Sequence, residues 1–200
     1  MVNHTKQKVM NTATSLFFQK GFHGTSVRDI ADKANVNVSL ISYYFKNKQG
    51  LLEYIVTTYY EAYLTQMEET MEAEQGNSAM EKMQSLIATI IQYKQSNHQL
   101  TCFIQRELSL YSVFVSEITV TYLAKENHFL RKAFNDLMPS TPIKKVDQPF
   151  FFMQLKGMLI TPYVMQHEWK HHVIGEETES LFVKRYVNTI QHWLDHLVTR

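Results

Sequence analysis

Residues 16–52 read LFFQKGFHGTSVRDIADKANVNVSLISYYFKNKQGLL and contain clear signals for short helices. Ser26 and Asp29 have the spacing of a helix-capping box, and the apolar stripe that follows predicts a helix of about two turns. Another short helix is expected from about Val38 to Tyr44. Upstream, helical periodicity over residues 4–20 predicts a longer helix. Two glycines that can adopt left-handed geometry follow it and end it. Two short helices behind a longer one are the layout of a helix-turn-helix reader.

The two faces of the helix near residues 38–45 differ in chemistry. Leu40, Ile41 and Phe45 are expected to point inward. Asparagine and serine side chains hydrogen-bond base edges or phosphates, a tyrosine hydroxyl reaches a phosphate, and lysines neutralise backbone charge. The outward residues with this chemistry are Asn37, Ser39, Ser42, Tyr43, Lys46 and Lys48. In the alternative reading, Tyr43 and Tyr44 complete a small core; we expect Tyr44 in the core and Tyr43 on the surface.

Charge is unevenly distributed along the chain. Residues 1–50 contain seven Lys and Arg residues but only two acids, whereas the remaining residues are net acidic and the whole chain is +1. A basic first quarter is typical of a polyanion-binding head joined to a separate body. Taken alone, the charge distribution is explained equally well by a solvated basic face that binds no partner.

Composition favours an all-helical chain. Six glycines and four prolines in 200 residues leave few turn signals for strands. Cys102 is the single cysteine, which excludes an internal disulfide and, without a signal peptide, predicts a cytoplasmic protein. No apolar run reaches membrane-spanning length, so no membrane association is expected.

The remaining sequence predicts a body of longer helices. Their expected ranges are about 50–74, 78–95, 99–111, 113–138, 149–170 and 177–198, which gives about nine helices in all. We therefore predict a three-helix helix-turn-helix head over residues 1–50 and a helical-bundle regulatory and dimerisation domain over residues 51–200.

The last two predicted helices carry more apolar surface than one small body needs. Two such helices from each subunit close into a four-helix bundle with two-fold symmetry. Intramolecular core explains about half of these residues equally well. The residues predicted at the dimer interface are Phe151, Met158, Leu159, Phe182, Tyr186, Ile190, Trp193 and Leu197.

The quoted stretch resembles the DNA-binding head of the TetR family of regulators. The shared features are a Gly, a Thr-Ser-Val turn, an Ile-Ala pair, a short recognition helix ending in Tyr-x-Phe, and a Lys before the fourth helix. The resemblance spans about residues 5–55 and implies a homodimer whose heads enter successive major grooves of near-palindromic double-stranded DNA. By this resemblance Thr25, Ser26, Tyr43 and Lys48 contact the DNA backbone, and Asn37, Val38, Ser39 and Ser42 read base edges. Val38 stands where the family often has Lys or a small polar residue. Valine cannot make a polar contact with a base, so the contact expected of it is an apolar one with a thymine methyl group.

The segment NVNVSLISYYFK, residues 35–46, is similar to TetR-type members of sporulating Bacilli that bind chromosomal sites and influence placement of the cell-division ring. This resemblance implies a nucleoid-associated protein with a surface for the division machinery, for which Arg106, Glu107 and Glu117 are the candidates. The alternative is a conventional repressor released by a small-molecule effector. The polar residues that could bind such an effector are Tyr93, Cys102, Gln105, Arg106 and Gln154. A role in packing or a position on the surface explains each of these residues equally well. The operator, the effector and the partner stay open, and no cofactor is expected.

A third hypothesis comes from HEWKH, residues 167–171. It matches the H-E-x-x-H pattern in which two histidines one helical turn apart bind zinc and the glutamate acts as a base. Nine histidines make a chance match easy, and Ile174 and Glu177 replace the Gly and His of the extended pattern. A zinc hydrolase also leaves the basic head unexplained. We therefore expect no enzyme and no functional metal, with His167, His171 and His172 at most an incidental metal site.

Overall fold

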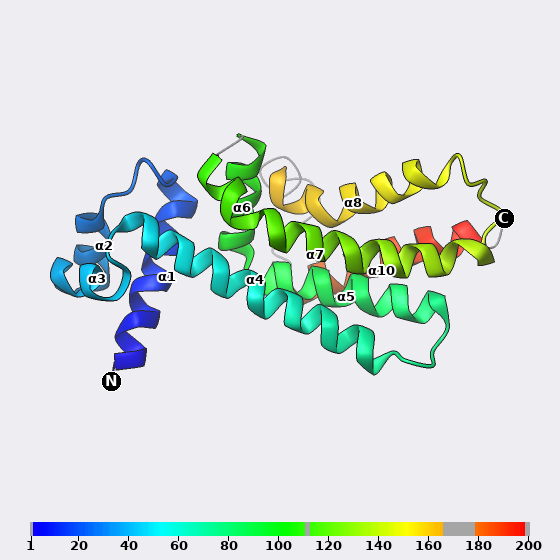
Figure 1. Ribbon diagram of the computed structural model, residues 1–200, viewed down its shortest axis with the longest axis horizontal. Helices are drawn as coiled ribbons and strands as arrows, with labels where there is room; N and C mark the ends of the chain where they lie inside the picture. Colours follow the sequence, from blue (N-terminus) through cyan, green and yellow to red (C-terminus); the bar gives the residue numbers. More distant parts are fainter. Residues whose placement is uncertain (1, 111–112, 166–178, 199–200) are drawn as a thin grey trace. The chain divides into compact units, whose positions relative to one another are not determined.

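The computed structural model describes residues 2–110, 113–165 and 179–198, and every regular element in those ranges is a helix (Figure 1). The all-helical class expected from the sequence is confirmed. Contacts divide the chain into two compact units. The head unit holds residues up to Glu61 together with His98–Val120, and the body unit holds Ala62–Asn97 together with residues from Thr121 onward. By contact, residues 98–120 therefore group with the head, while a functional division at residue 50 stays a prediction.

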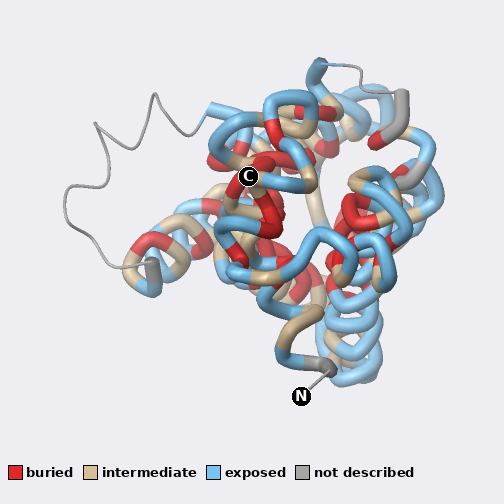
Figure 2. Tube along the Cα trace, turned by 90° about the vertical axis from the view of Figure 1, so that its left-hand side faces the viewer, coloured by how far each residue is buried: buried red, intermediate tan, exposed pale blue. Residues whose placement is uncertain are grey.

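The head unit is built from short helices around one apolar cluster. Its elements are α1 (Val2–Lys20), α2 (Val27–Ala34), α3 (Val38–Phe45), the first part of α4 (Lys48–Ala73) and α6 (His98–Ser109). The buried segments of these helices are red in Figure 2. The enclosed side chains of the head unit include those of the predicted helical stripes: Val9, Ala13, Leu16, Phe17, Ile30, Ala31, Ala34, Ile41 and Phe45.

Local hydrogen bonds start α2 as the sequence predicts. The Ser26 hydroxyl accepts from the Asp29 backbone N–H at 3.0 Å, and the Asp29 carboxylate accepts from the Ser26 N–H at 2.8 Å. The Ser26 hydroxyl also donates to this carboxylate at 2.7 Å, and this bond together with that from the Ser26 N–H holds the pKa of Asp29 below its usual value. Gly21 has the expected left-handed backbone, with φ 74°. Gly24 serves differently, because an added Cβ there would lie 2.3 Å from the Lys20 carbonyl oxygen.

The body unit contains the rest of α4 and the later helices of the chain. These are α5 (Ala79–Ser96), most of α7 (Val113–Leu137), a 3-10 turn (Met138–Ser140), α8 (Gln148–Val164) and α10 (Glu179–Val198). α10 and α8 both contact α5. The described helices begin and end within a few residues of the predicted ranges, except that α8 is capped by Met165 although its pattern predicted a helix to residue 170.

A proline inside α8 explains one long-range hydrogen bond. Pro162 has no N–H, so the Met158 carbonyl one turn earlier lacks its intrahelical donor. The Tyr186 hydroxyl of α10 donates to that carbonyl at 2.6 Å. Burial raises the pKa of Tyr186 to about 12, which keeps the phenol protonated and able to donate. Tyr186 therefore joins α10 to α8 within one chain.

An ion pair is buried between α5 and α7. Lys94 Nζ lies 3.1 Å from Glu126 Oε1, and the Tyr63 hydroxyl donates to the same oxygen at 2.7 Å. Burial raises the pKa of Glu126, but the charge of Lys94 and the hydrogen bonds from Tyr63 and Lys94 outweigh it, with a smaller contribution from Lys156. The pKa of Glu126 consequently lies below its usual value, and the carboxylate is ionised.

Candidate nucleic-acid interface

The α3 helix presents a polar face that two buried side chains hold in place. Ile41 and Phe45 are 0% and 4% exposed. Tyr43 is 80% exposed, which confirms its predicted surface position, and Tyr44 is half-buried against the Tyr43 and Phe45 rings. The four predicted base readers are exposed as well: Asn37, Val38, Ser39 and Ser42. Their exposure makes them available to DNA, and their contacts with bases stay a prediction.

Asn37 has a structural role as well as a predicted reading role. Its side-chain oxygen accepts from the Ser39 N–H at 2.9 Å and from the Ser39 hydroxyl at 2.8 Å, so it caps the start of α3. Its amide N–H group makes no hydrogen bond within the described part of the chain. An amide N–H donor at the start of a recognition helix suits an acceptor on a base edge or a phosphate.

Thr25 corrects the prediction of a side-chain contact with DNA. Its side chain is 1% exposed, and its hydroxyl donates to the carbonyls of Gly21 at 2.9 Å and Leu16 at 3.3 Å. The hydroxyl therefore satisfies carbonyls at the end of α1 instead of facing solvent. Ser26 is exposed, but its hydroxyl is bonded to Asp29.

Lys48 is also engaged inside the head unit. Its ammonium group donates to the Phe22 carbonyl at 2.8 Å and the Thr25 carbonyl at 2.7 Å, and it lies 4.3 Å from the centre of the Phe22 ring. These bonds fasten the start of α4 to the turn between α1 and α2. A phosphate contact by Lys48 would have to share or replace them, so its predicted role in DNA binding is weaker than that of an uncommitted lysine.

Lys46 is exposed at the end of α3 in an unusual backbone conformation. Its φ of 67° and ψ of −55° belong to a rare, strained γ-turn, closed by the Asn47 N–H donating to the Phe45 carbonyl at 2.8 Å. Gly50 permits this turn, because an added Cβ would lie 2.2 Å from the Phe45 oxygen. Glycine would adopt this backbone conformation at position 46 without strain. That a lysine stands here in spite of the strain is consistent with a functional role for its charge, such as the predicted DNA contact.

Sequence reasoning missed a cation at the edge of this face. Lys6 of α1 lies 3.7 Å from the centre of the Tyr54 ring and 5.7 Å from that of Phe45. Contacts of this kind hold the ammonium group over the aromatic rings. Lys6 was visible only as part of the basic first quarter, since no local pattern joins residue 6 to residue 54.

The predicted partner surface is only partly exposed. The Arg106 guanidinium donates to the Phe17 carbonyl at 2.8 Å and the Phe18 carbonyl at 3.1 Å, which ties α6 to the end of α1. Glu107 is 8% exposed. Both residues therefore leave the predicted interaction surface, while Glu117 is exposed and stays a candidate.

The candidate effector residues are divided between the two units of the chain. Cys102 is buried beside His98 on α6, and Arg106 is bound to α1, both in the head unit. Tyr93 belongs to the body unit, where Gln154 is exposed on α8. Gln105 is half-buried on α6.

Half of the predicted dimer-interface residues are core residues of the single chain. Leu159, Phe182, Ile190 and Leu197 are between 0% and 8% exposed, which leaves them little surface for contact with a second copy. Phe151, Met158, Tyr186 and Trp193 are half-buried, and their contact with a partner stays a prediction. The periodicity identified an apolar face correctly but did not show that the chain itself covers it.

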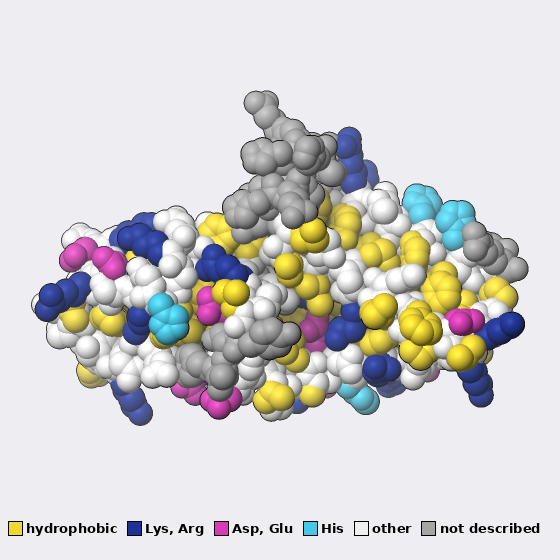
Figure 3. Space-filling view, turned by 90° about the horizontal axis from the view of Figure 1, so that it is seen from above, with side chains coloured by type: hydrophobic (Ala, Val, Ile, Leu, Met, Phe, Trp, Pro, Cys, Tyr) yellow, Lys and Arg dark blue, Asp and Glu magenta, His cyan; other side chains and the backbone are white. Residues whose placement is uncertain are grey.

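The outer face of α8 is an apolar surface that the described part of the chain leaves open. Phe150 and Met153 are 60% and 64% exposed, and Val164 is 44% exposed. Gly157 lies on the same face, at helical spacing from the other three, and an added Cβ there would meet nothing within 4 Å. Hydrophobic side chains are visible on the α8 side of the body unit in Figure 3.

Neither metal nor membrane features occur among the residues that the structure describes. The HEWKH histidines, including His172 beside them, lie outside those residues. Within the described ranges, no group of three or more His, Cys, Asp and Glu side chains is placed to hold a metal ion. No described helix is both long and apolar enough to cross a membrane.

Comparisons with known proteins bear on the whole chain. Residues 9–55 match the sequence model of bacterial regulatory proteins, tetR family. Over 190 residues the chain is 36% identical to the probable HTH-type transcriptional regulator YttP of Bacillus subtilis strain 168, covering 95% of this chain and 92% of YttP.

Two solved structures share the fold. The ketosteroid transcriptional regulator KstR2 of Mycobacterium tuberculosis aligns with a TM-score of 0.76 at 14% identity, over 94% of this chain and 93% of its own. The regulator PfmR of Thermus thermophilus aligns with a TM-score of 0.72 at 16% identity, over 92% of this chain and 97% of its own.

Proposed function

The chain belongs to the TetR family of bacterial regulatory proteins, and from that premise we propose that it is a ligand-responsive repressor of neighbouring genes. Regulators of this family bind DNA and function as dimers; they are not enzymes. The observation that carries the proposal is the exposed polar face of α3, anchored by buried Ile41 and Phe45 within a basic head. Base edges read by such a face give sequence specificity, and phosphate contacts by neighbouring cations set register.

The proposed dimer forms through the outer face of α8. Glycine inside a helix costs roughly 0.5–1 kcal/mol relative to alanine, yet nothing in the described chain crowds position 157. A helix from a second copy could approach the backbone closely at Gly157, because no side chain stands there. This helix would cover Phe150, Met153 and Val164. Two-fold symmetry then pairs the same face with itself, which holds two heads for two half-sites.

A second candidate function rests on the amino-acid sequence in and before α3. Residues 35–46 resemble RefZ, the TetR-type protein of sporulating Bacilli that binds chromosomal sites and influences placement of the division ring. In this function the protein associates with the nucleoid, and its exposed surface, including Glu117, contacts the division machinery. The repressor is preferred because it needs only the properties general to the family.

Mapping bound DNA across the genome separates these two functions. The repressor predicts sites in promoters next to its own gene, from which an extract of small metabolites releases the protein. The RefZ-like function predicts a few sites near the replication origin and a division defect on overproduction. Origin-proximal sites that no metabolite fraction releases would replace the repressor with the second function.

A further inference from the structure

The middle of the chain carries a strong negative charge that the proposed DNA contacts do not use. From Gln49 to Glu81 the sequence has seven glutamates and no Lys, Arg or His. These residues form most of α4 and the start of α5. The carboxylates of Glu74 and Glu81 accept hydrogen bonds in the turn that joins the two helices, and Glu81 has a lowered pKa because of its bonds with Ser78. The surface around the end of α4 therefore attracts cations.

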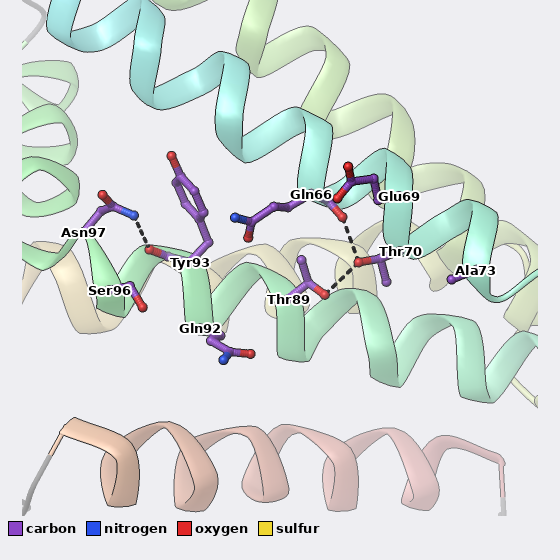
Figure 4. Close-up of a pocket in the computed structure, with 9 residues that line it drawn as sticks. All are labelled: Gln66, Glu69, Thr70, Ala73, Thr89, Gln92, Tyr93, Ser96 and Asn97. Atoms are coloured by element: carbon purple, nitrogen blue, oxygen red, sulfur yellow. Dashed lines mark hydrogen bonds between the residues drawn. The ribbon is translucent and has the colours of Figure 1, made fainter. Parts of the chain in front are cut away.

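A groove of about 530 Å³ lies between α4 and α5 in this acidic part of the body unit. Figure 4 shows side chains from the two helices along it. One wall is formed by Gln66, Glu69 and Thr70, and the other includes Thr89, Tyr93 and Asn97. Tyr93 is 7% exposed and gives the groove an aromatic surface, while Glu69 is exposed. The volume suits a small organic molecule.

The two threonine hydroxyl groups in the groove have already used their protons. The Thr70 hydroxyl donates to the Gln66 backbone carbonyl at 2.8 Å, and it lies 2.9 Å from the Thr89 hydroxyl. Because Thr70 has one proton, Thr89 donates to Thr70, and the Thr89 oxygen keeps its lone pairs as acceptors. The Glu69 carboxylate is an acceptor only. It has no Lys or Arg within ion-pair distance in the described part of the chain.

A neighbouring acceptor also lacks a donor. Gln95 Oε1 on α5 is buried and has no hydrogen-bond partner. It lines a second groove, toward α10, whose lining shares Gln92 and Ser96 with the first groove. The second groove includes one described cation, Lys184. A buried acceptor without a partner costs roughly 1–3 kcal/mol, so an N–H donor arriving at this position is stabilising.

We propose that the groove between α4 and α5 binds a small organic cation with several N–H groups. The ligand places one ammonium group on Glu69, and its N–H groups donate to Thr89 and to the acceptors that follow along α5 toward Gln95. The Tyr93 ring packs against its hydrocarbon part. That this cation is also the effector that controls DNA binding rests on the proposed function; the binding site itself does not.

Titration calorimetry of the full chain with spermidine tests the site. We expect saturable binding of one spermidine per chain. Glu69→Gln removes the carboxylate without changing its size and is expected to weaken binding roughly tenfold, as for loss of one charge-assisted hydrogen bond. Thr89→Val removes the acceptor oxygen and should weaken binding by several-fold. The matched control is Glu68→Gln, which removes the same charge from an adjacent exposed position that does not line the groove.

Equal weakening by Glu69→Gln and Glu68→Gln would mean that spermidine senses only the general negative field, and it would overturn the site. Absence of saturable binding would overturn it as well. DNA release is measured separately, as the difference between wild type and Glu69→Gln at the same spermidine concentration, because spermidine itself binds DNA equally in both. Binding that depends on Glu69 without any difference in release would keep the site and remove this cation as the effector of the proposed repressor.

Discussion

The double variant Phe150→Glu/Met153→Glu is expected to be a folded monomer that has lost most of its affinity for operator DNA. Both side chains are more than half exposed in the single chain, so the charges do not disturb the core. In the proposed dimer both positions are buried, where an unpaired carboxylate is costly. Loss of the second linked head removes the effective-concentration gain, so operator affinity should fall about 100-fold or more. Analytical ultracentrifugation and a DNA-binding titration measure the two effects.

Val120→Glu is the control for this variant. Val120 is 62% exposed on α7, so the substitution adds a charge to an exposed apolar position that is not part of α8. It should leave both the mass and the affinity unchanged. A Phe150→Glu/Met153→Glu protein that still sediments as a dimer would move the interface away from the outer face of α8.

Lys94→Met is expected to destabilise the protein by about 3 kcal/mol, because it leaves the Glu126 carboxylate buried without its cation. In a chain of this size the melting temperature should fall by roughly 10 °C. Thermal unfolding followed by circular dichroism measures this shift. The double variant Lys94→Met/Glu126→Leu removes both charges and should recover most of the loss, which separates the unpaired charge from the change in packing. Equal melting temperatures for Lys94→Met and wild type would show that the pair contributes little.

The same pair predicts how stability depends on pH. The folded-state pKa of Glu126 lies below its usual value of 4.5, so the unfolded chain takes up a proton first as pH falls. The contribution of Glu126 is therefore fully present above about pH 5 and is lost as pH falls toward its folded pKa. In Lys94→Met, burial without the cation should raise that pKa instead, and stability should then decrease as pH rises through it.

Local rules predicted the head because its helices are defined by nearby residues. The capping box of Ser26 and Asp29, the inward stripe and the exposed Tyr43 all follow from spacings of a few residues. The roles of Thr25 and Lys48 did not follow in this way. Lys48 donates to carbonyls 23 and 26 residues earlier, so the packing of α4 on the α1–α2 turn decides which of its partners are available.

The dimer face shows a different limit of sequence reasoning. Ile190 and Leu197 have the same apolar character and periodicity as an interface residue, yet they are buried in the single chain. Periodicity identifies which residues share a helix face but not which surface covers that face. Arg106 shows the same limit for charges, because its carbonyl partners on α1 lie 88 and 89 residues away.

Selection of bound sequences from a random DNA pool measures whether α3 reads DNA as part of a dimer. The wild-type protein is expected to enrich a near-palindrome whose half-sites are about one helical turn apart. Ser42→Ala should relax preference at one base pair in each half-site and cost about 1–3 kcal/mol at the preferred site. If the wild type enriches no sequence, the protein is not a sequence-specific DNA reader. If Ser42→Ala and variants of the other exposed α3 residues keep the wild-type preference, α3 does not read the bases.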